Sequence, residues 1–553
     1  MSHHALYKKH GFTALILFVV FTSGVLAIAR TTRGHDWGGD FAAYIMQAKS
    51  VIEATPQTYL EANRFTIEQS SNRMGPIAYP WGYPLLLVPI YSLYGLNPLA
   101  LKSIGLISHL LFLLLLWGTL RKEHSTPFVV FLICLFAFNP TFLEFVDQIM
   151  SDLPFLLIST LCMFLTRDII VRRRCIISRF WDLFLLGAGV AFACQIRSNG
   201  VLLLVALVVT HVASAFHRHH SDVQINGTCQ ARMVKPNISR GAAKKISMAL
   251  PLVPYATFLC FTSTFNVLLP EGGASHLSHF HDVSMFTVKS NLYKYLELPS
   301  EFFRGAPLPL LMFGATIPLA VAGAIHRFRS EYNSAIYMVL TLLTYIVWPA
   351  YPVVRFLFPI FPFYFSFAIS GLEIFANGGT TIRQRRIRYI IAFAPVILVL
   401  RYFLLNDVKA ARWDFKPNSE ITYGPFASTS KELFSFVANH TEPDSVIIFF
   451  KPRVMKLMTD RQSIRMTRAD LLFRGDYLCL YQGPGASFQV SPVIIAQLEA
   501  HGTAKIVFEN KDFKVYRLIN NEYPQPSDNN KLSYLGGGRK HLLTCPNALA
   551  ASL

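Results

Sequence analysis

The sequence predicts a polytopic α-helical membrane protein that carries a C-terminal extracytoplasmic α/β domain. Only 15% of its 553 residues are charged, whereas a soluble chain carries about 25%. The mean hydropathy is +0.38, and the apolar residues gather in runs that reach the roughly 17–25 residues needed to cross a bilayer. Beyond residue 405 the long runs give way to short alternating ones, which are typical of strands.

About eleven membrane spans are expected from these runs. The first covers Gly11 to Ala29 and is interpreted as a retained helix, because no small-residue cleavage site follows it. A separate stretch, 83–95, is short and contains two prolines, so we expect it to lie at the membrane interface or to re-enter rather than span. The further spans are expected at 98–119, 127–141, 152–167, 180–196, 199–216, 247–266, 306–326, 334–350, 354–372 and 388–405.

The positive charge follows the expected topology. The net charge is +19, and in a membrane protein this excess is better explained by Lys and Arg in cytoplasmic loops than by nucleic-acid binding. Lys8 and Lys9 precede the first span, which puts the N-terminus in the cytoplasm. If 83–95 does not span, Arg121 and Arg172 to Arg174 also fall inside. The C-terminal domain then lies outside, and the short loops favour a bacterial cell (inner) membrane.

Three parts are expected along the chain: a transmembrane domain over 1–405, an extracytoplasmic α/β domain over 406–525 and a flexible tail over 526–553. The first outer loop, 30–97, is assigned to the transmembrane domain. In the α/β domain, helix-like segments at 430–440 and 493–500 each precede a strand-like run, at 445–450 and 505–508, and a last run follows at 513–518. No internal repeat of the kind seen in many transporters is visible.

The most informative stretch is the acidic motif of the first outer loop, which runs from His35 to Tyr44. Its carboxylates, Asp36 and Asp40, lie beside a membrane exit, where a charge is costly unless it has a role. We predict a catalytic or substrate-binding role for at least one of them, with Asp40 favoured. The alternatives are a solvated loop face and acids at a helix start that favour the dipole. Gly38 and Gly39 indicate a bent backbone between them.

Other polar residues are expected at the same outer face. They are Asp152, Arg197 and Arg355, together with Tyr83. Ionisable residues at span ends are functional candidates, and these are expected to converge with the acidic motif on one extracytoplasmic cavity. The alternatives are that each arginine reaches for lipid headgroups, and that Asp152 is the N-cap of a helix with Pro154 in its first turn.

A histidine cluster lies between two later spans and is also expected outside. His276, His279 and His281 are of the type that ligates a divalent metal. The flanking Gly272-Gly273 pair gives no rigid geometry, so a solvated loop is the favoured alternative. The eight cysteines show no pair with metal-ligand spacing.

The order of these motifs resembles a known superfamily. The acidic motif is followed by Tyr79-Pro-Trp-Gly-Tyr83-Pro, by Asn139-Pro140 leading to Ser151-Asp-Leu-Pro-Phe, by Arg197-Ser-Asn-Gly, and by Arg355-Phe-Leu-Phe-Pro. Over roughly residues 10 to 400 it resembles the multi-spanning GT-C glycosyltransferases. Within them it is similar to the dolichyl-phosphate-mannose–protein mannosyltransferase-like and aminoarabinose-transferase-like group, of the glycosyltransferase family 39 type.

The resemblance implies a hexosyl or pentosyl transferase that uses a polyprenyl-phosphate sugar as donor on the outer side of the membrane. It implies that Asp40 or Asp36 is the general base, while Arg355, Arg197 and any divalent metal hold the donor phosphate, with Asp152, Tyr44 and Tyr83 in support. The sequence has Asp-Trp-Gly-Gly-Asp where the group commonly has an Asp-Glu pair, which leaves open both the acid and the acceptor class.

The chemistry fits the residue types independently of the resemblance. An acceptor hydroxyl needs a carboxylate to take its proton, and a phosphate suits bidentate arginine. A lipid-linked sugar flippase or transporter and a non-catalytic membrane assembly protein remain as alternatives.

Overall fold

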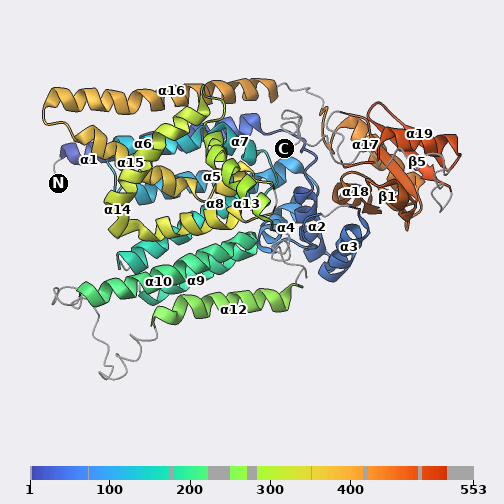
Figure 1. The fold of residues 1–553 in the computed structure, drawn as a ribbon, viewed down its shortest axis with the longest axis horizontal. Coiled ribbons are helices and arrows are strands. Elements are labelled where there is room, and N and C mark those ends of the chain that lie inside the picture. The colour runs from blue at the N-terminus through green and yellow to red at the C-terminus, as the bar shows by residue number, and fades with distance from the viewer. Residues whose placement is uncertain are drawn as a thin grey trace. The chain divides into compact units, whose positions relative to one another are not determined.

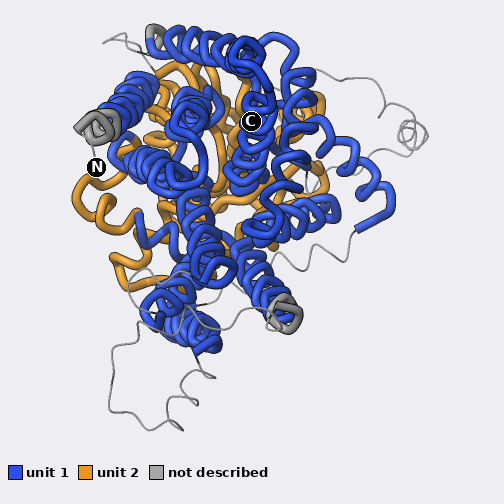
Figure 2. The backbone as a smooth tube through the Cα atoms, turned by 90° about the vertical axis from the view of Figure 1, so that its left-hand side faces the viewer, with its two compact units in different colours: residues 1–32, 80–86, 99–417 blue, residues 33–79, 87–98, 418–553 orange. Residues whose placement is uncertain are grey.

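The computed structural model describes residues 3–71, 74–173, 179–221, 250–270, 283–349, 351–414, 421–483 and 488–519. The chain divides into two compact units (Figure 1, Figure 2). Unit 1 comprises Met1–Thr32, Pro80–Leu86 and Leu99–Pro417, and unit 2 comprises Arg33–Tyr79, Leu87–Pro98 and Asn418–Leu553. The predicted tail at 526–553 and the cluster of His276, His279 and His281 lie outside the described residues.

Unit 1 is a bundle of long apolar helices in which α14 packs against α15, and α9 packs against both α8 and α12. Its longer elements are α1 (His3–Arg30), α5 (Pro98–Leu120), α6 (Thr126–Ala137), α7 (Pro140–Val146), α8 (Asp152–Thr166), α9 (Arg179–Ile196), α10 (Val201–Ser221), α12 (Val253–Leu268), α13 (Met285–Glu297), α14 (Pro309–Ile346), α15 (Phe361–Asn377) and α16 (Ile382–Asp414). The short elements are η1 (Arg167–Val171), η2 (Ser198–Gly200), η3 (Leu250–Leu252), η5 (Leu298–Phe303) and η6 (Val354–Leu357).

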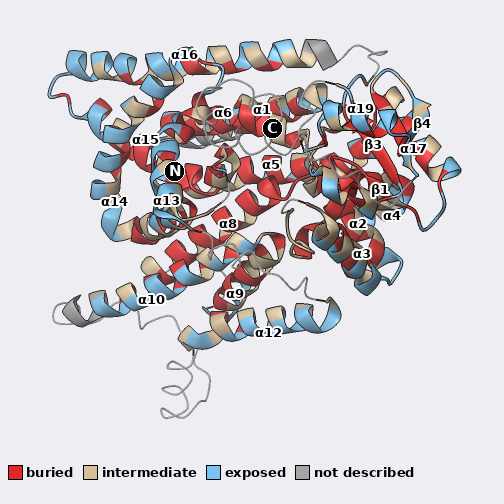
Figure 3. Cartoon of the chain, turned by 45° about the vertical axis from the view of Figure 1, so that its right-hand side comes forward, coloured by how far each residue is buried: buried red, intermediate tan, exposed pale blue. Residues whose placement is uncertain are grey.

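Among the described residues, 8 helices are long and apolar enough to cross a membrane, or up to 9 if the bent pair α6–α7 counts as one span. The expectation of about eleven differs from this count because α15 has only 17 residues and because α14 covers two expected spans. The backbone of α14 is non-helical at Glu331, which separates its two helical segments. Figure 3 shows exposed residues along α12 and α16, many of them large and apolar, as expected of helices that face lipid.

Helices α14 and α15 approach each other closely through two glycines. A Cβ atom at Gly323 would lie 1.9 Å from the Phe367 carbonyl oxygen, and one at Gly371 would lie 2.0 Å from the Leu319 carbonyl oxygen. Only glycine fits at such distances, and small residues at a helix contact are the usual means of tight packing in membranes.

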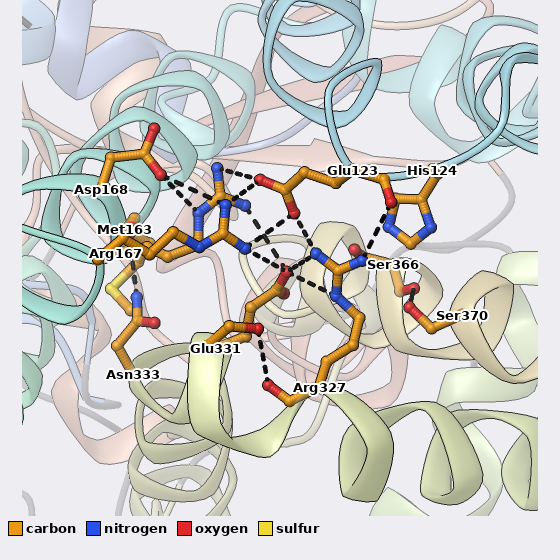
Figure 4. A network of polar contacts seen from close by, with 12 residues as sticks. Glu123, His124, Met163, Arg167, Asp168, Arg327, Glu331, Asn333, Ser366 and Ser370 are labelled. Atoms are coloured by element: carbon orange, nitrogen blue, oxygen red, sulfur yellow. Dashed lines mark hydrogen bonds and ion pairs between the residues drawn. The ribbon is translucent and has the colours of Figure 1, made fainter. Parts of the chain in front are cut away.

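A polar network joins the segments that follow α5 and α8 to the middle of α14 (Figure 4). Arg167 and Arg172 both contact the Glu123 carboxylate, at 2.9 and 2.5 Å. Arg327 pairs with both Glu123 and Glu331, and its Nη2–Glu331 Oε1 distance is 2.6 Å. Glu331 is the residue at which α14 breaks, so buried ion pairs hold this bend. The three segments are among those that the charge pattern assigns to the cytoplasmic side.

Unit 2 combines the first outer loop with the C-terminal α/β domain. The loop part, residues 33–79, is called the acidic loop here and contains α2 (Asp40–Ile52) and α3 (Pro56–Gln69). Helix α4 (Gly82–Tyr94) begins in unit 1 and ends in unit 2, and its 13 residues are too few to span a bilayer. From the sequence, the acidic loop was assigned to the transmembrane domain. In the structure it belongs to the same compact unit as the C-terminal domain, residues 421–519.

The C-terminal domain is a five-stranded mixed sheet in the order β2-β1-β3-β5-β4. Strand β1 is parallel to β2 and β3, while β5 is antiparallel to β3 and β4. Its elements are α17 (Ser428–His440), β1 (Val446–Ile448), α18 (Pro452–Thr459), β2 (Gln462–Ile464), η7 (Ala469–Arg474), β3 (Tyr477–Tyr481), α19 (Pro492–Ala500), β4 (Ala504–Glu509) and β5 (Phe513–Leu518). Every predicted helix and strand of this domain is present, and the predicted fold class is confirmed.

Candidate active site

Asp40 is the first residue of α2, and Gly39 stands at the N-cap position without a side chain to cap the helix. The Tyr79 hydroxyl donates a hydrogen bond of 2.6 Å to Asp40 Oδ1. Gln47, two turns further along α2, bonds both the N–H and the C=O of Tyr79, at 3.1 and 2.9 Å. The Tyr79 ring packs on that of Tyr44, with 4.7 Å between centroids. Helix α2 therefore holds both Asp40 and the phenol that bonds to it.

The phenol of Tyr79 remains a hydrogen-bond donor under ordinary conditions. Its burial, together with the neighbouring Asp40 charge, raises the pKa of Tyr79 well above 10. The hydroxyl thus stays protonated and donates to the carboxylate. The N-terminal end of α2 favours negative charge at the same position.

Asp36 is committed to local structure. Its Oδ1 accepts the Gly38 N–H at 3.0 Å and lies 2.9 Å from His35 Nδ1. Partial burial acts to raise the pKa of Asp36, but the contacts with His35 and Gly38 and the nearby Lys451 charge together bring it below 3.8. The His35 ring is buried and stacks on Phe41, with 4.0 Å between centroids. The predicted bend at Gly38 and Gly39 is confirmed, and Asp36 lies just before it.

Trp37, between the two acids, is anchored in the C-terminal domain. Its side chain is buried, with the residue only 4% exposed. The indole lies 5.1–6.5 Å, centroid to centroid, from five rings of that domain, at Phe434, Phe449, Phe450, Tyr481 and Phe513. This aromatic cage fixes the backbone that carries Asp36 and Asp40.

The C-terminal domain supplies cations that were not singled out from the sequence, and one of them, Lys451, interacts with both acids. Lys451 follows β1 and Arg465 follows β2, at the carboxyl ends of parallel strands, where ligands bind in open α/β sheets. Burial and the Arg465 charge lower the pKa of Lys451, against the opposing charges of Asp36 and Asp40. A basic residue directly after the predicted strand 445–450 was the available signal. A third cation, Arg453, follows in α18.

In unit 1 the structure brings together Asp152, Arg197 and Arg355, as predicted. Arg197 Nη1 lies 2.5 Å from Asp152 Oδ1, and Arg355 Nη1 lies 3.9 Å from Asp152 Oδ2. The Asp152 side chain is 1% exposed. The N-cap interpretation of Asp152 is wrong, because Ser151 occupies the cap position and Asp152 is the first helical residue of α8. One carboxylate thus gathers two guanidinium groups, and guanidinium groups are of the type that binds phosphate.

Aromatic side chains surround this arginine cluster. Tyr345 stacks on Phe356 at 4.9 Å and accepts a hydrogen bond of 2.5 Å from Asn199 Nδ2. The Arg355 guanidinium lies 5.7 Å from the Phe356 ring centroid. Tyr83, which was predicted to support the site, is fully buried in the part of α4 that belongs to unit 1.

A buried ion pair fixes the end of α1, where the acidic loop begins. Lys102, 1% exposed, donates to Asp147 Oδ1 at 2.7 Å and to the Thr32 carbonyl at 2.9 Å. Asp147 in turn accepts the Thr32 N–H at 2.7 Å. Lys102 was not singled out from the sequence, because a lone lysine in the first turn of an apolar helix also fits a snorkelling role.

The two halves of the predicted site fall in different units: Asp36, Asp40 and Tyr44 in unit 2, and Asp152, Arg197 and Arg355 in unit 1. Their convergence on one cavity stays a prediction. Within the described part of the chain, no group of three or more His, Cys, Asp or Glu side chains is placed to hold a metal ion. The predicted ligands His276, His279 and His281 lie outside that part of the chain.

No protein-family model and no curated protein matches the sequence. Its fold, however, matches that of solved structures over nearly the whole chain, which agrees with the resemblance at the level of fold alone.

Two of the matching structures are of ArnT from Cupriavidus metallidurans. The one bound to undecaprenyl phosphate has a TM-score of 0.56 at 12% identity, over 93% of this chain and 100% of that one. The apo form has 0.56 at 13% identity, over 94% and 100%. The apo oligosaccharyltransferase of Archaeoglobus fulgidus has 0.49 at 11% identity, over 83% and 65%.

Proposed function

We propose that this protein is an integral membrane glycosyltransferase that moves a sugar from a polyprenyl-phosphate-linked donor to an acceptor hydroxyl on the extracytoplasmic side. The fold match over the whole of ArnT, one structure of which is bound to undecaprenyl phosphate, supports the donor class. The observation that carries the chemistry is the Asp40 carboxylate, held at the start of α2 by the Tyr79 hydroxyl. The N-terminus is cytoplasmic in this proposal, and the membrane is the cell (inner) membrane.

In this proposal Asp40 is the general base. It takes the proton of the acceptor hydroxyl as the acceptor oxygen attacks the anomeric carbon, and the bond from that carbon to the phosphate oxygen breaks, releasing polyprenyl phosphate. Asp36 is less suited to the role. His35 and the Gly38 N–H already contact its Oδ1 and commit it to local structure.

The donor phosphate is assigned to Arg355 and Arg197. Their planar guanidinium groups match phosphate oxygens in a bidentate manner. Asp152 contacts both of them and in this proposal orients them toward the leaving phosphate.

Asp40→Asn tests the base assignment. General-base catalysis contributes about 10²–10⁴-fold, so we expect sugar transfer from a polyprenyl-phosphate sugar to fall by about that factor, while Asp36→Asn stays within roughly tenfold of the wild type. Unchanged size-exclusion and thermal-unfolding profiles show that each variant is folded. Full activity of Asp40→Asn contradicts the assignment.

The transfer assay also separates the alternatives. A wild-type protein that moves the lipid-linked sugar across vesicles without transferring it is a flippase. A protein that does neither contradicts the proposed function and leaves the non-catalytic alternative.

A further inference from the structure

We propose that the C-terminal domain is a working part of the catalytic site, and that Arg453 is its positioning residue: it fixes the segment of the acidic loop from which Tyr79 holds Asp40. The inference deepens the proposed function and rests on it for its catalytic consequence. The anchoring itself stands on contacts within unit 2 alone.

Arg453 binds the acidic loop through several side-chain hydrogen bonds. Arg453 lies in α18 and is 4% exposed. Its Nη2 donates to the carbonyl oxygens of Pro76 at 2.6 Å and Gly75 at 3.2 Å. Its Nε donates to Asn63 Oδ1 at 3.1 Å, and Asn63 Nδ2 in turn donates to the Ile77 carbonyl. One guanidinium group thus ties α18 to α3 and to the three-residue segment 75–77.

Tyr79 links this segment to Asp40. Tyr79 follows two residues after Ile77, and the Arg453 guanidinium lies 5.7 Å from its ring centroid. Gly75 packs closely against both side chains, because a Cβ atom there would lie 2.9 Å from the Tyr79 hydroxyl and 3.2 Å from Arg453 Nη1. The same hydroxyl bonds to Asp40 Oδ1 at 2.6 Å. A shift of the segment therefore displaces the donor to the carboxylate.

The geometry of the Arg453 guanidinium, rather than its charge, anchors the segment 75–77. Its acceptors among the described residues are neutral oxygens of three different residues. A planar fork with several fixed N–H donors is suited to contact them together. Lysine keeps the charge and loses the fork. Arg453→Lys therefore isolates positioning from electrostatics.

The chain offers a matched control in Arg461. Its Nη2 donates to two carbonyl oxygens, of Ala438 at 2.8 Å and Thr441 at 3.0 Å, and its Nε donates to Thr441 Oγ1 at 3.2 Å. It uses the same donor atoms on acceptors of the same kind, but these acceptors belong to the C-terminal domain itself. Arg461→Lys thus disturbs that domain comparably without touching the acidic loop.

The anchoring is tested by hydrogen–deuterium exchange on the full-length protein in detergent, which needs no activity. The reporter is the Tyr79 amide, which donates to Gln47 Oε1 at 3.1 Å. We expect peptides over 74–79 and the start of α2 to exchange at least tenfold faster in Arg453→Lys and at the wild-type rate in Arg461→Lys. Equal exchange in the two variants overturns the proposal.

The catalytic consequence is tested by kinetics with a polyprenyl-phosphate sugar. We expect kcat to fall about 10–100-fold in both Arg453→Lys and Tyr79→Phe, with the donor KM unchanged. The acidic limb of the pH profile should move to higher pH, because the carboxylate loses a donor to its charged form. The double variant should be no worse than Tyr79→Phe alone, since both act through one bond. Additive losses, or equal kcat in Arg453→Lys and Arg461→Lys, overturn the positioning role.

The two assays keep the proposals distinct. If the wild type transfers no sugar, the proposed function fails, and the exchange experiment still decides whether Arg453 anchors the acidic loop. If the wild type is active and Arg453→Lys matches Arg461→Lys in both assays, only the positioning role fails.

Discussion

Replacing Trp37 by alanine tests whether the acidic loop is held by the aromatic cage of the C-terminal domain. The indole is almost completely buried among five rings. Burying about 200 Å² of ring surface at roughly 25 cal/mol per Å² corresponds to about 5 kcal/mol, and measured Trp→Ala losses in packed cores are about 3–5 kcal/mol.

A loss of that size changes the population of the detached loop. At about 1.4 kcal/mol per tenfold, 3–5 kcal/mol raises the open fraction by roughly two to four orders of magnitude. Asp40 starts α2 three residues after Trp37. In the detached state of the loop, the position of the Asp40 carboxylate is therefore no longer fixed. Trp37→Phe keeps a ring in the cage, so it should recover most of the difference.

The assay is amide exchange of α2 in the full-length protein, with thermal unfolding as a check on the C-terminal domain. Phe436→Ala is the matched control. Phe436 stacks on Phe508 at 4.7 Å within the same domain, and no ring contact joins it to Trp37 among the described residues. Exchange in α2 that is no faster in Trp37→Ala than in Phe436→Ala would refute the reasoning.

Two further substitutions probe unit 1. Arg355→Ala should raise the donor KM about tenfold or more, with a smaller effect on kcat, because a charge-assisted phosphate contact is lost; an unchanged donor KM in steady-state kinetics speaks against the assignment. Asp147→Asn should destabilise the protein by about 3 kcal/mol, since it breaks the ion pair of the buried Lys102 ammonium. Adding Lys102→Met should restore part of the loss in thermal unfolding, and a double variant less stable than Asp147→Asn alone contradicts the ion pair's importance.

The sequence predicted best where local periodicity decides the structure. The helix and strand pairs of the C-terminal domain follow from short alternating runs, and Asp152, Arg197 and Arg355 were found together because polar residues at span ends are rare and costly. Helix starts were less certain. Ser151 rather than Asp152 precedes the first turn of α8, and both residue types are good N-caps.

The roles of Trp37, Lys451 and Arg453 could not be predicted from the sequence. Each depends on the acidic loop packing against a domain hundreds of residues away, and no local pattern encodes such a contact. Arg453 reads locally as a surface arginine of an amphipathic helix, because its acceptors lie in α3 and the 75–77 segment.

The acidic loop is synthesised well before the C-terminal domain against which it packs. Asn63 and Arg453 are 390 positions apart, and at 5–20 residues per second the ribosome needs roughly 20 to 80 seconds to make that stretch. During this time the helices between them can insert while Trp37 has no cage to enter. The acids of the nascent chain therefore lack this support until the C-terminal domain is synthesised, and a chain truncated within α16 would contain the acidic loop without the aromatic cage that holds Trp37.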